Sequence, residues 1–229
     1  MFVNCCFHDW ILQSKEVVLK FISAIAAGSI SACDLWEYVM KKQNRKHQGL
    51  SDVRHIKLKD EDIKVILRAA DEIIFQADKS LLIQILEGSK DTEILELKLD
   101  ECPSYSYYSN NTSDEISEYV DWMIIHNYLE ITYEGQTPLI VFTEKGWETY
   151  KPICADELFH KILESDDSEK KELLVLLKDV NRQVITLLLN QIGDSQNTVF
   201  IDFLKIWEKK EAKKVRVKIK GALNKLMSV

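Results

Sequence analysis

Hydrophobic positions recur at helical spacing near the start of the chain. Ile11, Val18, Ile22 and Ile25 fall on one side of a helix, and the break at residues 28–29 ends that pattern before a second helix begins. A helical hairpin is therefore expected over residues 9–42. The polar, basic run at residues 41–49 predicts a domain boundary, which gives a first domain at residues 1–48.

The middle of the chain changes from helical to alternating patterns. Residues 53–58 alternate like a short strand, and Asp60 is expected to cap a helix with an apolar stripe from Ile63 to Ile74. A second helix is predicted over residues 79–87, where Gly88 supplies a stop, and a third starts at Ser113. Residues 102–111 are rich in Ser, Tyr and Asn and predict a loop.

A β-hairpin is predicted after the third helix. Residues 128–133 and 139–143 are strand-like, and residues 134–138 between them have the composition of a turn. Three helices followed by a hairpin is the order of a winged helix. The second domain is accordingly placed at residues 49–153.

The remainder of the chain predicts helices only. A long apolar helix is expected over residues 173–192, another over 198–209 and a last one over 212–227. Short helices with short links resemble HEAT-repeat units, which suggests a HEAT-like layer at residues 154–229. The predicted fold class is mostly α (α+β): a helical hairpin, a winged helix-turn-helix with a β-wing, and a helical C-terminal layer.

Charge is distributed unevenly along the sequence. The net charge of −7 divides into −2 for residues 1–40, +5 for 41–68, −17 for 69–204 and +7 for 205–229. Two basic segments thus flank an acidic centre. They are interpreted either as solvated helix faces or as surfaces that follow nucleic-acid phosphates.

The cysteines and the N-terminus bear on location and on metals. Five cysteines form no paired framework, residues 1–10 carry no Lys or Arg, and no apolar stretch is long enough to span a bilayer, so a cytoplasmic protein is expected with no membrane contact. Cys5, Cys6, His8 and Cys33 could in principle meet around zinc, but adjacent cysteines rarely bind one tetrahedral ion. No metal and no cofactor is therefore predicted. His126 is interpreted as a histidine at the edge of the core.

Two short motifs resemble the RQC domain that follows the motor of RecQ helicases. The first is Leu86-Glu87-Gly88-Ser89-Lys90, which departs from the family's Leu-Arg-Gly-Ser-Lys at Glu87, and the second is Thr143-Glu144-Lys145-Gly146 after the predicted wing. The resemblance covers roughly residues 55–153. The arrangement of the whole chain is similar to that of small bacterial proteins described as RQC-minor DNA-binding proteins.

The motor of such helicases has no counterpart in the sequence. No Gly is followed by Lys-Ser or Lys-Thr, so the phosphate-binding loop of an ATPase is missing. No Cys-x-x-Cys occurs either, so the zinc module that precedes many RQC domains is missing. A non-enzymatic protein is predicted.

The resemblance implies a set of DNA-binding residues, because RQC domains engage duplex ends through the helix before the wing, the loop leading to it and the wing itself. These candidates are Ser89, Lys90, Tyr105, Tyr107, Tyr108, Asn110, Asn111, Tyr133, Gln136, Thr137 and Lys145. The three loop tyrosines are expected either to stack on bases or, for Tyr105 and Tyr108, to pack under the wing. The C-terminal basic helix adds Lys213, Lys214 and Arg216 as phosphate contacts.

Two functions are favoured by the sequence, and an enzyme without a recognised motif stays open as a third. The first is a DNA-binding accessory protein of repair or replication, with a duplex end or fork as its partner. The second is a protein–protein adaptor, which the balance of −12 over residues 69–155 favours, because an acidic domain repels a polyanion.

Overall fold

The computed structural model describes residue 50 and residues 53–228. These residues divide into a first compact unit that ends at Trp147 and a second that begins at Glu148. The predicted helical hairpin, the basic run at residues 41–49 and the residues considered for zinc lie outside the described part. The predicted domain limits at residues 48 and 153 stay predictions.

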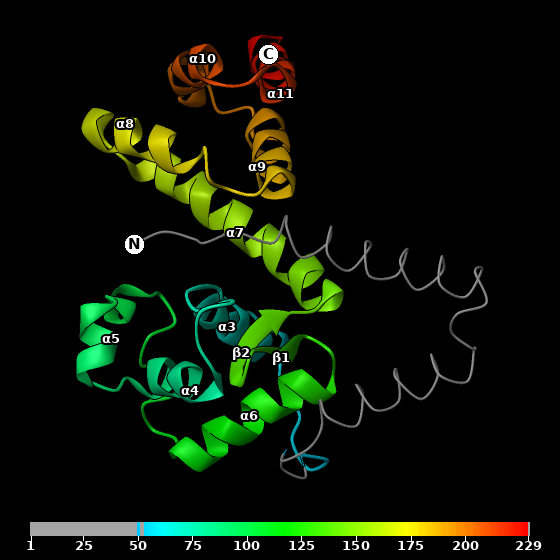
Figure 1. The fold of residues 1–229 in the computed structure, drawn as a ribbon. Helices are drawn as coiled ribbons and strands as arrows, with labels where there is room; N and C mark the ends of the chain where they lie inside the picture. The colour runs from blue at the N-terminus through cyan, green and yellow to red at the C-terminus, as the bar shows by residue number, and fades with distance from the viewer. Residues whose placement is uncertain (1–49, 51–52, 229) are drawn as a thin grey trace, which may run out of the picture. The chain divides into compact units, whose positions relative to one another are not determined.

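The first unit has the element order of a winged helix (Figure 1). Nine α-helices and one two-stranded antiparallel hairpin make up the described residues, which confirms the predicted mostly helical class. The helices and strands of this unit are α3 (Asp60–Asp71), α4 (Lys79–Glu87), α5 (Thr92–Glu96), the 3-10 turn η1 (Leu99–Glu101), α6 (Ser113–Ile125), β1 (Leu129–Glu134) and β2 (Thr137–Phe142).

The apolar stripes of α3 and α6 face the core of this unit. Ile66 and Leu67 of α3 are fully buried, as are Ile116, Val120 and Met123 of α6. Burial of one such side chain contributes about 1.5–3 kcal/mol, so these stripes hold the three-helix layer together. The predicted helical periods are confirmed for both helices.

The segment before α3 differs from the prediction. Residues 53–58 form a turn and an extended stretch rather than a strand, and the Ile56 amide donates to the Val53 carbonyl at 3.0 Å. In the described part of the chain this segment has no neighbouring strand to pair with, and a segment with alternating apolar residues forms a strand only when it has such a partner. Asp60 is the first helical residue rather than the cap, and the Lys59 amide donates to Asp62 at 3.0 Å.

The wing is a tight hairpin. Leu129 pairs with Phe142 and Glu134 with Thr137, which leaves Gly135 and Gln136 as a two-residue loop. Gly135 has φ +63°, the left-handed conformation that such loops require and that glycine adopts at little cost. The predicted hairpin is confirmed.

Helix α7 (Glu144–Glu164) begins directly after the wing, earlier than predicted, and includes Pro152. The Thr143 hydroxyl accepts from the Gly146 amide at 3.0 Å, and the Thr143 amide donates to the Tyr128 carbonyl at 3.2 Å. A Cβ on Gly146 would lie 1.9 Å from the Tyr128 carbonyl oxygen. The Thr-Glu-Lys-Gly motif thus closes the hairpin against the start of α7, and the closure needs glycine.

The second unit contains the remainder of α7 and four further helices. The predicted helix over residues 173–192 is wrong, because the chain breaks before Arg182 and the Asn181 side chain accepts from the Gln183 amide at 2.8 Å to cap a new helix. Helix α11 (Lys213–Met227) matches the helix predicted over residues 212–227, with Val215, Ile219 and Leu223 buried. The four helices are α8 (Asp167–Leu176), α9 (Arg182–Asp194), α10 (Phe200–Lys210) and α11 (Lys213–Met227).

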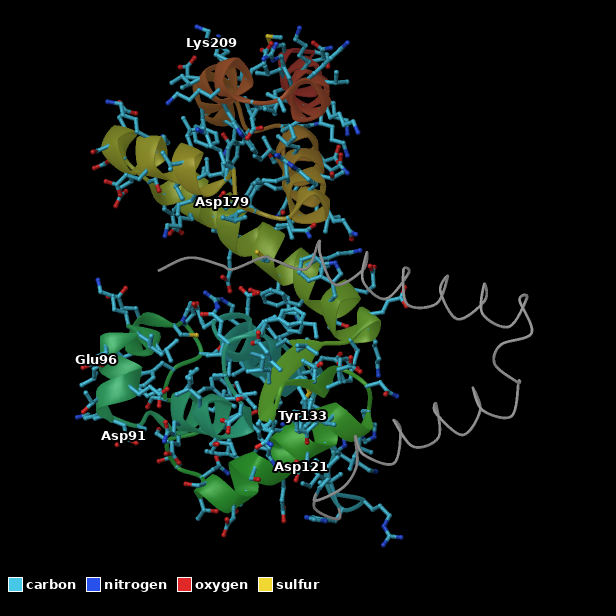
Figure 2. All side chains as sticks on the ribbon, in the orientation of Figure 1. Asp91, Glu96, Asp121, Tyr133, Asp179 and Lys209 are labelled. Atoms are coloured by element: carbon cyan, nitrogen blue, oxygen red, sulfur yellow. The ribbon has the colours of Figure 1, made fainter. Side chains whose placement is uncertain are left out.

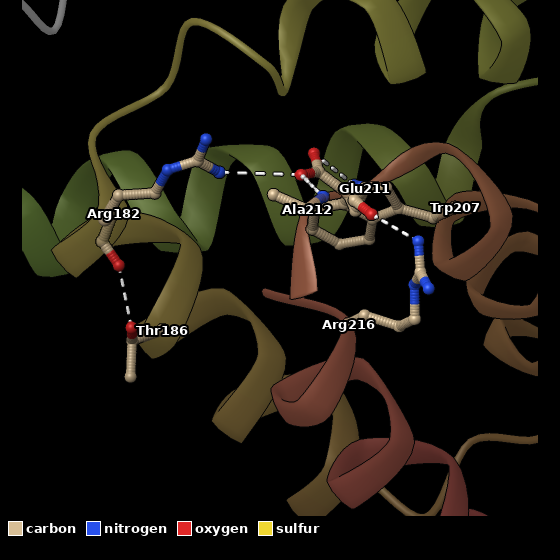
Figure 3. A network of polar contacts seen from close by, with 6 residues as sticks. All are labelled: Arg182, Thr186, Trp207, Glu211, Ala212 and Arg216. Carbon is tan, nitrogen blue, oxygen red and sulfur yellow. Dashed lines mark hydrogen bonds and ion pairs between the residues drawn. The ribbon is translucent and has the colours of Figure 1, made fainter. Parts of the chain in front are cut away.

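A buried carboxylate joins α9, α10 and α11 (Figure 3). Glu211 accepts from the Trp207 indole N–H at 3.0 Å and from the Ala212 amide at 3.2 Å, and its carboxylate lies 3.6 Å from Arg182. Its backbone carbonyl accepts from Arg216 at 2.9 Å. The turn that sets the start of α11 is therefore fixed by polar contacts as well as by apolar packing. A HEAT-like character of this unit stays a prediction.

Candidate nucleic-acid interface

The end of α4 holds the loop at residues 102–111 in place. Gly88 has φ +82°, and a Cβ there would lie 2.7 Å from the Ser106 side chain. The Ser106 amide donates to the Ile85 carbonyl at 3.0 Å, and the Tyr108 amide donates to Leu86 at 2.9 Å. The Gly-Ser-Lys motif therefore marks a close approach between helix and loop.

The three loop tyrosines do not share one environment. Tyr107 is 49% exposed, whereas Tyr108 is buried and its hydroxyl donates to Asp62 at 2.8 Å. Burial, followed by the hydrogen bond to Asp62, raises the pKa of Tyr108 well above its ordinary value. The half-buried Tyr105 donates to the Ser89 carbonyl at 2.9 Å. Of the two alternatives left open for Tyr105 and Tyr108, the structure favours packing, although their hydrogen bonds run to Ser89 and to Asp62 of α3 rather than to the wing, and Tyr107 presents its ring to solvent.

The remaining candidates near this loop are polar and lie at the surface. Lys90 and Asn110 are exposed. The Ser89 hydroxyl accepts from the Asp91 amide at 3.2 Å, and Asn111 donates to both Glu115 and Tyr119 at 3.3 Å. Ser89 and Asn111 therefore already serve local structure.

The tip of the wing is exposed. Tyr133 is 61% exposed near the end of β1, and Gln136 and Thr137 beside it are also exposed (Figure 2). An exposed aromatic ring at the tip of a hairpin offers a π-face to a nucleobase.

Helix α6, which precedes the wing, is acidic. Asp114 and Glu115 are exposed in its first turn, and the Thr112 amide donates to Glu115 at 2.9 Å. This hydrogen bond, with a smaller contribution from Asn111, lowers the pKa of Glu115. Asp121 is buried and pairs with Lys79 of α4. A helix with this charge is poorly suited to follow phosphates.

Lys145 contacts a group of stacked aromatic rings that the sequence did not predict. Its ammonium nitrogen lies 3.7 Å from the centre of the Tyr128 ring and donates to the His126 carbonyl at 3.1 Å. The rings of Trp122 and His126 stack with centroids 3.8 Å apart. His126 is exposed rather than at the edge of the core, because it follows Trp122 by one helical turn outside the buried stripe. The i, i+4 spacing of Trp122 and His126 is the signal that could have found this pair.

The basic candidates of α11 lie on the solvent side of that helix. Lys213, Lys214 and Arg216 are exposed, and Arg216 is held by the Glu211 carbonyl. These residues belong to the second unit and the wing to the first.

The described residues contain no group of three or more side chains suited to hold a metal ion. Within the same part of the chain, no helix has both the length and the apolar character needed to cross a bilayer.

Comparison with known families gives a match over the winged helix and the start of the helix that follows it. Residues 59–157 match the family described as RQC domain, which is a winged-helix module of a DNA-binding class. No helicase domain is found with it. No curated protein and no solved structure matches the chain. The similarity of the whole chain to RQC-minor proteins stays a prediction.

Proposed function

Because residues 59–157 form an RQC domain, we propose that the protein is a non-enzymatic DNA-binding accessory protein of repair or replication, and that its wing engages a duplex end or fork. The observation that carries this proposal is Tyr133, 61% exposed at the wing tip. A terminal base pair presents a flat π-face, and stacking on it tolerates any sequence. Tyr107 and Gln136 add contacts that favour an end over continuous duplex.

Affinity for phosphates comes from outside the RQC domain. Residues 69–155 have a balance of −12, and their acidic side chains repel a polyanion within a Debye length of about 8 Å at physiological salt. The exposed Lys213, Lys214 and Arg216 on α11 supply the opposite charge. Each phosphate that they neutralise adds about 0.9 to the slope of log affinity against log salt.

The proposal is tested by binding of the full chain to blunt, forked and single-stranded DNA over a range of salt concentrations. Y133A is expected to weaken binding to blunt and forked ends by about five-fold or more at an unchanged salt slope, while Y133F, which keeps the ring, binds like the natural protein. The triple variant K213A/K214A/R216A is expected to flatten the slope by about two to three. Equal binding of Y133A and the natural protein to every DNA would overturn the role of the wing.

A second candidate, a protein–protein adaptor, is favoured by one observation. Leu95 in α5 and Leu97 at its end are 49% and 46% exposed among acidic residues that include Asp91 and Glu96 (Figure 2). Such a surface suits a basic amphipathic segment of a partner. If no DNA binds, and a peptide with the sequence of residues 205–220 binds the natural protein but not L95S/L97S, the adaptor function replaces the first.

A further inference from the structure

The end of α6 and the start of the wing carry a surface stack of aromatic rings, here called the aromatic stack and made of Trp122, His126 and Tyr128. The ring centroids of Trp122 and His126 are 3.8 Å apart, those of Trp122 and Tyr128 are 6.1 Å apart, and each pair is tilted by 17°. Near-parallel rings at these separations present flat faces in one orientation.

The aromatic stack is fixed by hydrogen bonds. The His126 Nδ1 lies 2.9 Å from the Trp122 carbonyl oxygen, so Nδ1–H donates, and in the neutral ring Nε2 is left as an acceptor. Lys145 donates to the His126 carbonyl at 3.1 Å and lies over the Tyr128 ring. The rings are thus oriented before any ligand arrives, which reduces the entropy lost on binding.

The aromatic stack lies at the surface and outside the core. His126 is exposed and Trp122 and Tyr128 are half-buried, whereas the buried stripe of α6 consists of Ile116, Val120, Met123 and Ile124. Backbone hydrogen bonds already close the end of α6, since the Asn127 amide donates to the Ile124 carbonyl at 3.1 Å and the Tyr128 amide to the Met123 carbonyl at 2.9 Å. Three oriented rings are more than that closure needs.

Charges of both signs lie near the aromatic stack, because two carboxylates accompany the Lys145 ammonium over the Tyr128 ring, so the rings rather than a net charge define its ligand. Glu118 precedes Trp122 by one helical turn and lies 3.4 Å from His55, and Glu144 is exposed beside Lys145. Carboxylates at these positions disfavour a sugar–phosphate backbone that runs directly across the rings. A base that turns away from its backbone can still stack.

The hairpin separates the aromatic stack from the wing tip. Tyr128 and Tyr133 are five residues apart, which corresponds to about 17 Å along a strand. Because side chains alternate across a strand, an odd separation places the two rings on opposite faces of the wing. Tyr128 lies in the bend directly before β1, and the Thr143 amide donates to its carbonyl at 3.2 Å, which continues the hydrogen-bond pattern of the hairpin by one residue.

From this geometry we infer that the aromatic stack is a binding site for an unpaired nucleobase of a single-stranded arm, on the face of the wing opposite to the duplex end at Tyr133. This inference rests on the proposed function and names its substrate: a duplex with a single-stranded arm rather than a blunt duplex. At the 3.4 Å rise of one B-form strand, an arm that stays stacked spans about 17 Å with roughly five nucleotides, so the ten-nucleotide arms of the test are long enough to reach the site.

The test compares the affinities of the full chain for a fork with ten-nucleotide arms, the same fork with abasic arms, and a blunt duplex of the same sequence. The natural protein is expected to prefer the fork with bases over the abasic fork by about five-fold or more. H126A is expected to remove most of this preference, and H126Y, which keeps a ring, to retain it. H160A is a matched control, because His160 has the same Nδ1 contact to a carbonyl four residues earlier, at 3.0 Å from Asp156, but stacks on no tryptophan.

The outcomes separate the inference from the proposed function. If blunt duplex binds in a manner that depends on Tyr133 but abasic arms bind as tightly as arms with bases, the aromatic stack is only a helix closure and the inference is overturned. The same holds if H126A, folded by circular dichroism, keeps the preference for bases. If neither fork nor blunt duplex binds, the proposed function fails and the inference fails with it.

Discussion

Gly146 offers the sharpest test of how the wing is attached to α7. An alanine Cβ at this position would lie 1.9 Å from the Tyr128 carbonyl oxygen and 2.9 Å from its carbon, whereas carbon–oxygen contacts of this kind normally lie at about 3.3 Å or more. The obstacle is backbone and cannot rotate away. The chain must therefore move by more than an ångström where the hairpin closes.

The magnitude follows from what that movement breaks. The Tyr128 carbonyl accepts from the Thr143 amide and from the Thr143 hydroxyl, both at 3.2 Å, and each hydrogen bond contributes about 1 kcal/mol. Overpacking adds about 1–3 kcal/mol, and the better helix propensity of alanine returns at most about 1 kcal/mol. We expect G146A to lower the free energy of unfolding of the first unit by about 2–4 kcal/mol.

The assay is hydrogen exchange measured by mass spectrometry over a urea series, because it follows each unit separately. Gly221 in α11 is the matched control, since it is a helical glycine where an added Cβ would meet nothing within 4 Å. G221A should stabilise the second unit by about 0.5–1 kcal/mol. A G146A protein whose first unit unfolds at the same urea concentration as the natural one would refute the reasoning.

Five further substitutions test three other sets of contacts by urea unfolding. G135A should lower the free energy of unfolding by about 1–2 kcal/mol, which is the cost of the left-handed backbone alone, because an added Cβ would meet nothing there. G88A should lower it by about 1–3 kcal/mol more, because its Cβ would also meet the Ser106 side chain. Equal effects of the two substitutions would contradict the packing of Gly88 against Ser106. E211A should lower the free energy of unfolding by about 2–3 kcal/mol, because the buried donors of Trp207 and Ala212 lose their acceptor. R182A should lower it by less than about 1 kcal/mol, because Arg182 is 51% exposed. A larger effect of R182A than of E211A would contradict the role given to the Glu211 carboxylate. The pKa of Tyr108 is raised in the folded state, so its contribution is present at neutral pH and declines as pH rises past 10.0, where the unfolded phenol ionises; Y108F should lose this part of the alkaline dependence between pH 8 and 11.

Local chemistry explains which elements could be predicted from the sequence. Gly88 and Gly135 occupy left-handed positions that end α4 and turn the wing, so their places in the sequence mark those elements directly. The stripe of α11 repeats over four turns and leaves little choice of face. Signals of this kind depend on a few neighbouring residues.

Other elements depend on contacts that sequence spacing does not contain. Helix α5 has five residues, of which only Ile94 is buried, so it shows no period to recognise. Apolar residues continue on both sides of Asn181, so the break between α8 and α9 is visible only in the hydrogen bond that caps α9. Alternation at residues 53–58 predicted a strand, but a strand also needs a partner.

The residues of the candidate interface also differ in whether the sequence could predict their surroundings. Exposure of Tyr133 follows from its position beside a two-residue loop, which the sequence indicates. Burial of Tyr108 depends on Asp62, 46 residues earlier in the chain. The aromatic stack depends on Lys145, which reaches back 19 residues to the His126 carbonyl. Side chains that meet across such separations cannot be paired by inspection of one sequence.

Under the proposed function, the aromatic rings and the basic residues make different contributions to DNA binding. Stacking on Tyr133 or on the aromatic stack involves neutral faces and releases few counterions, so it depends weakly on salt. Phosphate contacts of Lys213, Lys214 and Arg216 release counterions and depend strongly on salt. Rising salt should therefore weaken binding to every DNA by a similar factor and leave the ratio between forked and blunt DNA nearly constant. An acidic RQC domain suits this arrangement, because it reduces affinity for continuous duplex and leaves discrimination to the rings.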